Sequence, residues 1–232
     1  MITVPVRQVT LATPRTRILH LDVRAAEFAF TAGQAVMLGL RGSPLRKPYS
    51  IASAPWEVET SGVMQLLVQV EDNGGLDPHL ERAAPGTPLD IDGPFGSFGL
   101  PAAAMDRPPL FVAGGTGIAP LRSMLMQHLA RAVTQPIAVV YSARAVDEFA
   151  FRAELAALES AGRIATYFTV TREEPADWPG RRGRISLEML QEALPSSESV
   201  CLVCGPPQLV EDTRALLAQL GVGASQVLVE QY

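Results

Sequence analysis

The segment Phe111-Val112-Ala113-Gly114-Gly115-Thr116-Gly117-Ile118-Ala119-Pro120 carries the strongest local signal in the chain. An apolar run ends at Ala113, three glycines follow, and the pattern predicts a helix that begins near Ile118. Glycine lets the backbone turn sharply and come close to a ligand, and the free N–H groups at the start of a helix face an anion. Pro120 suits the first turn of such a helix. The strand–loop–helix order favours a bound phosphate; the alternative is a tight turn without a ligand.

Strands and helices are predicted to alternate from this segment to Tyr232. The predicted strands are Leu110–Ala113, Ile137–Tyr141, Ala165–Val170, Val200–Val203 and Gln226–Glu230, and the predicted helices are Ala119–Ala132, Glu148–Ser160, Leu187–Ala193 and Gln208–Leu220. This alternation predicts a Rossmann-like α/β domain, in which a parallel sheet carries helices on both faces. Such sheets bind ligands at the carboxyl ends of their strands.

Residues 1–100 have the pattern of an all-β domain. The predicted strands are Ile2–Thr10, Thr16–Val23, Gln34–Leu40, Tyr49–Ala52, Val63–Val70 and Pro88–Asp92. Because turn residues separate six short runs, we expect a small antiparallel β-barrel, capped at one end by a short helix at Pro78–Arg82. Pro101–Pro109 is predicted to be a connector, which leaves 110–232 as the α/β domain.

Composition limits the classes of partner. The formal net charge of −5 argues against broad nucleic-acid binding. No apolar run approaches the ~20 residues that span a bilayer, and the segment Met1–Arg7 lacks the features of a signal peptide. We therefore expect a cytoplasmic protein that binds neither nucleic acid nor membrane.

The two cysteines, Cys201 and Cys204, have the C-x-x-C spacing of some metal and redox sites. They fall in a predicted buried strand, however, and residues three apart on a strand point to opposite faces. A zinc site would also need further ligands nearby. We therefore expect both thiols to be structural and the chain to have no metal site.

The segment Leu45–Ser53 brings two cations, an aromatic residue and a hydroxyl to the start of a strand. Tyr49 can lie against a planar ring, and Ser50 can donate to a ring nitrogen or carbonyl. Arg46 and Lys47 can meet a phosphate. Taken alone, the segment is also compatible with an ordinary solvated strand entry.

Together the two loops resemble the ferredoxin–NADP reductase superfamily, which includes cytochrome b5 reductases, oxygenase reductase components and flavin reductases. Five motifs in the same order carry the resemblance. They are Lys47-Pro48-Tyr49-Ser50, Gly93-Pro94-Phe95-Gly96-Ser97-Phe98, Gly114–Pro120, Cys204-Gly205-Pro206-Pro207 and Val229-Glu230-Gln231-Tyr232. They resemble, respectively, the flavin motif, the end of the barrel, the pyrophosphate loop, the nicotinamide motif and the terminal acidic–aromatic segment of the family.

The resemblance implies a site for hydride transfer between two rings. It implies that Tyr49 stacks on the flavin and that Ser50 hydrogen-bonds near flavin N5. Cys204 and Glu230 are expected to border the reacting atoms. Tyr232 is expected to cover the flavin face that the nicotinamide occupies, so it would have to move during turnover.

The resemblance also implies the cofactor-binding residues. For the flavin, FAD or FMN, they are Arg46, Lys47, Pro48, Tyr49, Ser50, Gly74, Gly75 and Leu76; for the nicotinamide dinucleotide they are Gly114, Gly115, Thr116, Gly117, Ser142, Arg144, Arg172, Gly205 and Pro206.

Two departures from the family pattern bear on flavin affinity. Lys47 stands where the family has arginine and loses a bidentate phosphate contact, for which Arg46 is a candidate replacement. Asp77 lies where the family often has a Ser or Thr hydroxyl, so we expect it to cap the short helix instead.

The ends of two predicted strands bear on the choice between NADPH and NADH. Ser142 and Arg144 follow the second strand of the α/β domain, and no acid that would hold a ribose diol occurs before Asp147. Thr171-Arg172-Glu173 resembles a segment of NADPH-using members, although NADH-using members also carry arginines there. The balance favours NADPH.

The predicted activity is hydride transfer from NAD(P)H to the bound flavin and onward transfer of electrons to a separate ferredoxin, flavodoxin or oxygenase. Candidates for a docking patch for that partner are the basic residues Arg41, Arg46, Lys47, Arg181, Arg182 and Arg184, for which an ordinary solvated surface is the alternative. Two alternatives remain open at this stage: a reductase that releases reduced free flavin, and a non-catalytic subunit that binds flavin or nucleotide.

Overall fold

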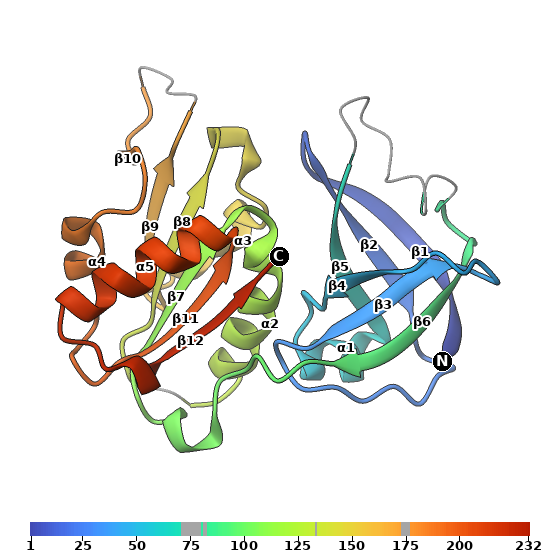
Figure 1. Cartoon of the computed structure of the whole chain (residues 1–232). Helices are drawn as coiled ribbons and strands as arrows, with labels where there is room; N and C mark the ends of the chain where they lie inside the picture. The colour runs from blue at the N-terminus through green and yellow to red at the C-terminus, as the bar shows by residue number, and fades with distance from the viewer. Residues whose placement is uncertain (71–79, 81–82, 133, 173–176) are drawn as a thin grey trace.

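The computed structural model of the chain contains two six-stranded sheets that lie side by side (Figure 1). It describes residues 1–70, 80, 83–132, 134–172 and 177–232. The predicted cap helix Pro78–Arg82 therefore lies, except for Leu80, outside the described residues, as does Asp77.

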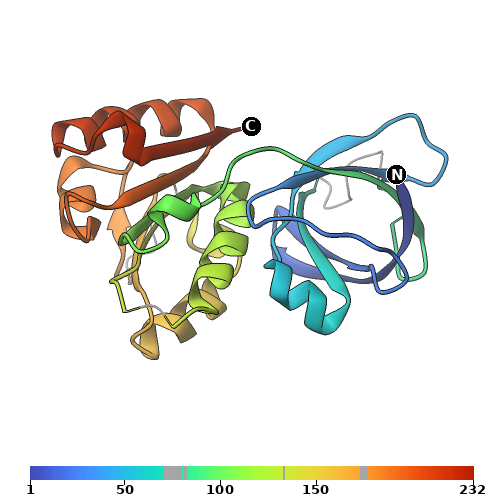
Figure 2. The ribbon, with the colours of Figure 1, turned by 90° about the horizontal axis from the view of Figure 1, so that it is seen from below.

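The first sheet is antiparallel, in the order β4-β3-β6-β1-β2-β5. Its strands are β1 Ile2–Thr13, β2 Thr16–Asp22, β3 Ala35–Leu40, β4 Lys47–Ser50, β5 Val63–Gln69 and β6 Pro88–Phe95. A bridge between Ile51 and Leu66 joins the two edge strands, and the Ala52 N–H donates to the Gln65 carbonyl. The sheet therefore closes into the predicted barrel (Figure 2), and closure removes its exposed edges.

Alternation along the barrel strands decides which side chains fill the interior. In β1, Val4 and Val6 are buried, whereas Thr3 and Pro5, the residues that precede them, are exposed. Leu19, Leu21 and many other aliphatic side chains complete this core.

The second sheet is parallel, in the order β10-β9-β8-β7-β11-β12. Its strands are β7 Pro109–Gly114, β8 Ala138–Ala143, β9 Ala165–Val170, β10 Arg181–Arg182, β11 Val200–Gly205 and β12 Val227–Gln231. The helices α2 Ile118–Leu129 and α3 Arg152–Ser160 pack on one face, and α4 Leu187–Ala193 and α5 Pro207–Gln219 on the other. This is the predicted Rossmann-like arrangement.

The chain order reverses at β7, because β8 lies on one side of it and β11 on the other. The crevice at such a reversal is the usual ligand site of an open α/β sheet. Here it opens beyond Gly114 and Gly205, the last residues of the two strands. Both glycine-containing motifs of the sequence therefore meet at one place.

Cys201 and Cys204 are both buried and unbonded to each other. Cys201 belongs to the core on one face of the parallel sheet and Cys204 to the core on the other. The prediction from strand geometry is confirmed, and among the residues that the structure describes no cluster of His, Cys, Asp or Glu has the composition of a metal site.

Three local features differ from the sequence prediction. The helix expected from Glu148 begins only at Arg152, because Phe151 has a φ of 58° and ends any continuous helix through it. Helix α1, Pro55–Ser61, was not predicted; it buries only Val58 and so leaves little apolar periodicity to detect. The two-residue strand β10 was also missed.

The barrel and the α/β domain contribute to one shared hydrophobic cluster, in addition to clusters of their own. Ala52, Leu67 and Phe98 of the barrel belong to the same buried cluster as Leu121 and Leu125 of α2. Helix α2 is thus the element on which the barrel packs (Figures 1 and 2). In the described part of the chain no helix is long and apolar enough to cross a bilayer.

Candidate active site

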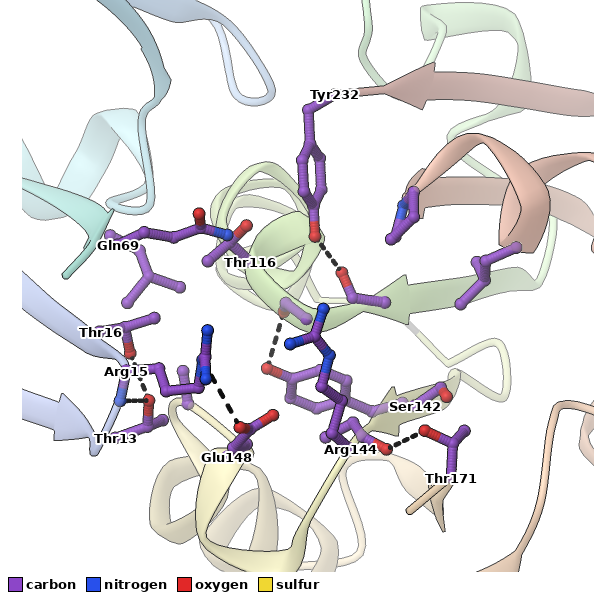
Figure 3. A pocket seen from close by; sticks show the side chains of 18 of the residues that line it. Thr13, Arg15, Thr16, Gln69, Thr116, Ser142, Arg144, Glu148, Thr171 and Tyr232 are labelled. Atoms are coloured by element: carbon purple, nitrogen blue, oxygen red, sulfur yellow. Dashed lines mark hydrogen bonds and ion pairs between the residues drawn. The ribbon is translucent and has the colours of Figure 1, made fainter. Parts of the chain in front are cut away.

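A cleft of about 370 Å³ separates the barrel from the carboxyl ends of the parallel strands (Figure 3). The barrel contributes Thr13, Arg15, Thr16 and Gln69, and the opposite wall is formed by the residues that follow β7, β8 and β11. Of the residues predicted from the sequence, those that line the cleft are Gly114, Gly115, Thr116, Ser142, Arg144, Pro206 and Tyr232.

The glycine loop is built around one close backbone contact. Residues Gly115–Gly117 form a single 3₁₀ turn between β7 and α2. A Cβ on Gly117 would lie 2.2 Å from the carbonyl oxygen of Cys204, far inside van der Waals contact. Gly115 has a φ of 53°, which favours glycine. Glycine is therefore required at 117 by packing against β11 and favoured at 115 by the positive φ.

Two tyrosine hydroxyls hold the carbonyls of this loop (Figure 3). The hydroxyl of Tyr141, from β8, donates to the Gly115 carbonyl at 2.9 Å. The hydroxyl of Tyr232 donates to the Gly114 carbonyl at 2.8 Å. Burial raises the pKa of both phenols, so both hydroxyls stay protonated and donate. The contribution of Tyr141 was not anticipated, because it depends on strand neighbours 26 residues apart in sequence.

Three of the four predicted catalytic residues meet where the barrel contacts the α/β domain, although none of them is among the residues that line the cleft. Ser50, at the end of β4, donates to Oε2 of Glu230 at 3.5 Å, and the Cys204 thiol lies 3.9 Å from the same oxygen. Cys204 and Glu230 are paired because β11 and β12 run in parallel register. Burial raises the pKa of Glu230, and the hydrogen bonds from Ser50 and Cys204 partly oppose that rise. Burial also raises the pKa of the Cys204 thiol, with the neighbouring carboxylate adding to the effect, so the thiol is neutral.

Tyr232, the fourth predicted catalytic residue, lies over the glycine loop. Its side chain crosses from the end of β12 to the loop (Figure 3); the residue as a whole is 54% exposed, and its hydroxyl end is the part that the loop covers. The structure thus brings Tyr232 to the cleft that contains Gly114 and Thr116.

The predicted flavin segment is the strand β4. Alternation places Lys47 and Tyr49 on one face of this strand and Pro48 and Ser50 on the other. Arg46, immediately before it, directs Nη2 toward Oδ2 of the buried Asp90 at 3.5 Å. The other predicted flavin ligands, Gly74, Gly75 and Leu76, lie outside the described residues.

At the far end of the cleft, Ser142 and Arg144 line the wall together with Thr171 (Figure 3). Arg172 is joined to this group through its backbone N–H, which donates to the Arg144 carbonyl at 3.0 Å. The Arg172 side chain is not among those that line the cleft.

Two further arginines line the cleft: Arg15 was not predicted, and Arg184 was predicted only as part of a docking patch. Arg15, in the turn between β1 and β2, lies 3.9 Å from Glu148 on the opposite wall. Arg184 lies 3.4 Å from Asp212. Neither is part of a local motif, and only the tertiary structure brings the β1–β2 turn beside the α/β domain.

The six basic residues considered as a docking patch do not gather on one surface. Arg41, Arg46 and Lys47 belong to the barrel, whereas Arg181 and Arg182 form β10, at the edge of the parallel sheet farthest from it in Figure 1. Arg181 is paired with Glu192 and Arg184 with Asp212. A single basic patch made of all six is therefore wrong.

A barrel joined to a parallel sheet, with a glycine loop opening on the cleft between them, defines a two-domain, dinucleotide-dependent oxidoreductase. Comparison with protein families agrees: residues 3–99 match the oxidoreductase FAD-binding domain and residues 111–215 the oxidoreductase NAD-binding domain. The chain belongs to the ferredoxin–NADP reductase superfamily and is an NAD(P)H-dependent flavoprotein reductase with FAD as its flavin.

Individual relatives support this assignment. Ferredoxin–NADP reductase B of Sorangium cellulosum is 36% identical over 219 residues, which cover 88% of this chain and 86% of the relative. The anthranilate 1,2-dioxygenase electron transfer component of Acinetobacter baylyi is 26% identical over 97% of this chain, but the match spans only 65% of that protein. Among solved structures, the cytochrome P450 reductase GcoB of Amycolatopsis superposes with a TM-score of 0.83 at 26% identity, over 99% of this chain and 68% of that one.

The raised pKa of Glu230 predicts a pH-dependent effect of Glu230→Gln. Below the ordinary value of 4.5 the carboxyl is protonated in both the folded and unfolded states. As the pH rises toward the higher folded pKa, the unfolded state ionises first, so the wild type loses stability that the glutamine variant keeps. We expect the Tm of the variant relative to wild type to shift upward between about pH 4 and about pH 8. Thermal unfolding at both pH values measures this, and a difference that does not change with pH contradicts it.

Proposed function

We propose that this chain takes hydride from NADPH onto FAD and passes the electrons to a separate protein acceptor of the ferredoxin or oxygenase type. The observation that carries the proposal is the contact between Ser50 of the barrel and Glu230 of the α/β domain, 3.5 Å apart, with Cys204 beside them. It brings the predicted flavin segment of the barrel next to the predicted nicotinamide segment of the α/β domain. The names of the relatives support the acceptor, since one is a ferredoxin–NADP reductase and another an electron transfer component of a dioxygenase.

The β4 segment of the barrel, which lies outside the residues that line the cleft, fits a flavin. Ser50 presents a hydroxyl at the meeting point of the two domains, and Tyr49, beside it, is half-buried. We assign Tyr49 to the flavin ring, Ser50 to its polar edge and Lys47 to its phosphate. Arg46 already has Asp90 as an acidic partner, so we leave it out of this assignment. The bound flavin supplies the hydride-accepting ring, and the protein supplies its orientation.

The α/β side of the cleft fits a nicotinamide dinucleotide. We assign its pyrophosphate to the Gly114–Gly117 loop at the start of α2, because the N-terminus of a helix attracts an anion. We assign its nicotinamide end to Cys204, Gly205 and Pro206. The Cys204 thiol and the Glu230 carboxyl then border the ring, and neither needs to act as a general base, because hydride transfer requires no such group.

Arg144 is the main reason for choosing NADPH. It lines the cleft beside Ser142 at the carboxyl end of β8, and within the described residues no acidic group is paired with it. An arginine can bind a 2′-phosphate through bidentate hydrogen bonds. Arg184, by contrast, already contacts Asp212.

Tyr232 is assigned a gating role. With its hydroxyl on the Gly114 carbonyl, it occupies part of the cleft that the dinucleotide is proposed to enter. Nucleotide binding is then expected to displace this side chain.

The visible absorbance spectrum of the purified chain, followed by anaerobic titration with NADPH and NADH, tests the proposal. We expect a yellow protein whose flavin absorbance bleaches with NADPH at lower concentrations than with NADH. Reduction of an added ferredoxin-type protein, in the absence of free flavin, tests the acceptor. A colourless chain that oxidises NADPH only when free flavin is added contradicts electron transfer to a protein, and a chain that neither takes up flavin nor reacts with either nucleotide contradicts the whole proposal.

A further inference from the structure

A buried arginine and two half-buried glutamates form a cluster where helix α2 meets the barrel. Arg122, on α2, has a side chain only 5% exposed. Two of its nitrogens donate to the carboxylate of Glu57, in α1, both at 2.9 Å. Two donate to the carboxylate of Glu154, in α3, both at 2.6 Å. Bidentate, charge-assisted pairs of this kind are strong and geometrically specific.

The two carboxylates lie on different sides of the domain interface. Glu154 belongs to the α/β domain, like Arg122 itself, whereas Glu57 belongs to the segment that follows β4 of the barrel. Oε2 of Glu57 also accepts from the backbone N–H of Ala54 at 2.7 Å. The bonds between Arg122 and Glu57 therefore connect the two domains, and Glu57 is itself bonded to the barrel backbone. The bonds between Arg122 and Glu154 lie within the α/β domain.

More bonds from the same helix fasten the same barrel segment. Nη1 of Arg122 donates to the Ala52 carbonyl at 2.8 Å, and the Ser123 hydroxyl donates to the Ser53 carbonyl at 2.6 Å. In the opposite direction, the indole N–H of Trp56 donates to the Met126 carbonyl at 3.1 Å. The barrel backbone from 52 to 57 is thus fixed along α2.

One residue beside this cluster has a strained backbone conformation. Phe151 has a φ of 58°, a left-handed conformation that is unfavourable for a phenylalanine. Its ring centroid lies 5.1 Å from the guanidinium carbon of Arg122, which is a cation–π contact. The strained conformation therefore places an aromatic face under the buried cation.

The cluster stands between the two halves of the proposed hydride-transfer site. On one side, Ala52 is two residues from Ser50. On the other, α2 continues directly from Gly117, whose backbone lies against the Cys204 carbonyl. Any movement of α2 against the 52–57 segment changes the distance between Ser50 and Cys204.

We propose that Arg122 is a positioning residue for hydride transfer, which holds the Ser50 end of the barrel and the glycine loop at a fixed distance by bonding Glu57 and the Ala52 carbonyl. This inference rests on the proposed function. It predicts that the connection between domains matters for rate, beyond what the cluster contributes to folding.

The variants Glu57→Gln and Glu154→Gln form a matched pair for the test. Each removes one carboxylate charge from the same cluster and leaves Arg122 with one carboxylate partner, but only Glu57→Gln weakens the bond between domains. We expect Glu57→Gln to slow flavin reduction by NADPH about tenfold in anaerobic stopped-flow measurements, since small misplacements of reacting groups have effects of this order. We expect Glu154→Gln to slow it by less than about twofold. The long-wavelength charge-transfer absorbance of the nucleotide–flavin complex should weaken only in Glu57→Gln.

Arg122→Met and Arg122→Lys extend the comparison. Arg122→Met should slow reduction at least as much as Glu57→Gln while flavin content and the Kd for NADP⁺ stay close to those of wild type. Arg122→Lys should restore part of the rate, since an ammonium can reach one carboxylate but cannot bind two in bidentate fashion. Arg163→Met, which removes a bond within the α/β domain to the Leu129 carbonyl, is the control and should leave the rate unchanged.

Equal slowing by Glu57→Gln and Glu154→Gln, or slowing that only follows the loss of Tm across all variants, overturns the inference. If Arg122→Met does not fold, the comparison of the two glutamine variants decides alone. A wild type that fails to reduce its flavin contradicts the proposed function rather than the role of Arg122.

Discussion

Gly117→Ala is expected to abolish most of the reaction with the nucleotide while leaving the chain folded. Gly117 has φ −60° and ψ −10°, which alanine adopts readily, so the backbone conformation is not the obstacle. The obstacle is the Cys204 carbonyl oxygen, 2.2 Å from the position of the new Cβ. To relieve that contact, the loop and β11 must separate by about 1 Å, a displacement that costs about a hundredfold in rate when it reaches the reacting groups.

We therefore expect flavin reduction by NADPH to slow about a hundredfold in Gly117→Ala. Overpacking costs about 1–3 kcal/mol, which for a chain of this size lowers Tm by about 2–12 °C. Stopped-flow absorbance and thermal unfolding measure the two effects. Gly221→Ala is the control: Gly221 has a φ of 82° with open space around its Cβ position, so alanine there should lower Tm without changing the rate. A Gly117→Ala variant with an unchanged rate contradicts the assigned position of the loop.

Arg144→Ala is expected to remove the preference for NADPH. A hydrogen-bonded contact to a charged group contributes about 1.5–3 kcal/mol, which corresponds to about a tenfold to hundredfold change in kcat/KM. We expect kcat/KM for NADPH to fall by that factor and kcat/KM for NADH to change less than about threefold, because NADH lacks the 2′-phosphate.

Steady-state kinetics with both nucleotides and a dye acceptor measure this selectivity. Arg163→Ala, which alters a cation outside the cleft, should leave the ratio of the two kcat/KM values unchanged. Equal losses with both nucleotides would show that Arg144 contacts a part of the ligand that NADPH and NADH share, and the choice of NADPH would then be wrong.

The sequence predicted those parts of the fold that are determined by residues close together in the chain. The Gly114–Pro120 segment, the alternation of apolar residues in β1, and the opposite orientation of Cys201 and Cys204 each follow from local geometry alone. The ordering of five motifs along the chain then identified the family and predicted that Ser50 and Glu230 belong to one site; the structure has them 3.5 Å apart.

What sequence did not predict depends on contacts between distant parts of the chain. Arg122 and Glu57 are 65 residues apart, and Arg122 and Glu154 are 32 apart. An arginine in an amphipathic helix looks like a solvated residue until another domain covers it. The same holds for the Tyr141 hydroxyl and for Arg15, and the break at Phe151 depends on a positive φ that is uncommon for phenylalanine.

The hydrophobic cluster that contains Ala52, Leu67 and Phe98 together with side chains of α2 has a consequence for how the molecule is built. Each half has a buried cluster of its own, and the two share this further cluster where they touch. The two domains are therefore expected to unfold as one cooperative unit. A barrel produced without the α/β domain would expose an apolar surface to water and tend to aggregate.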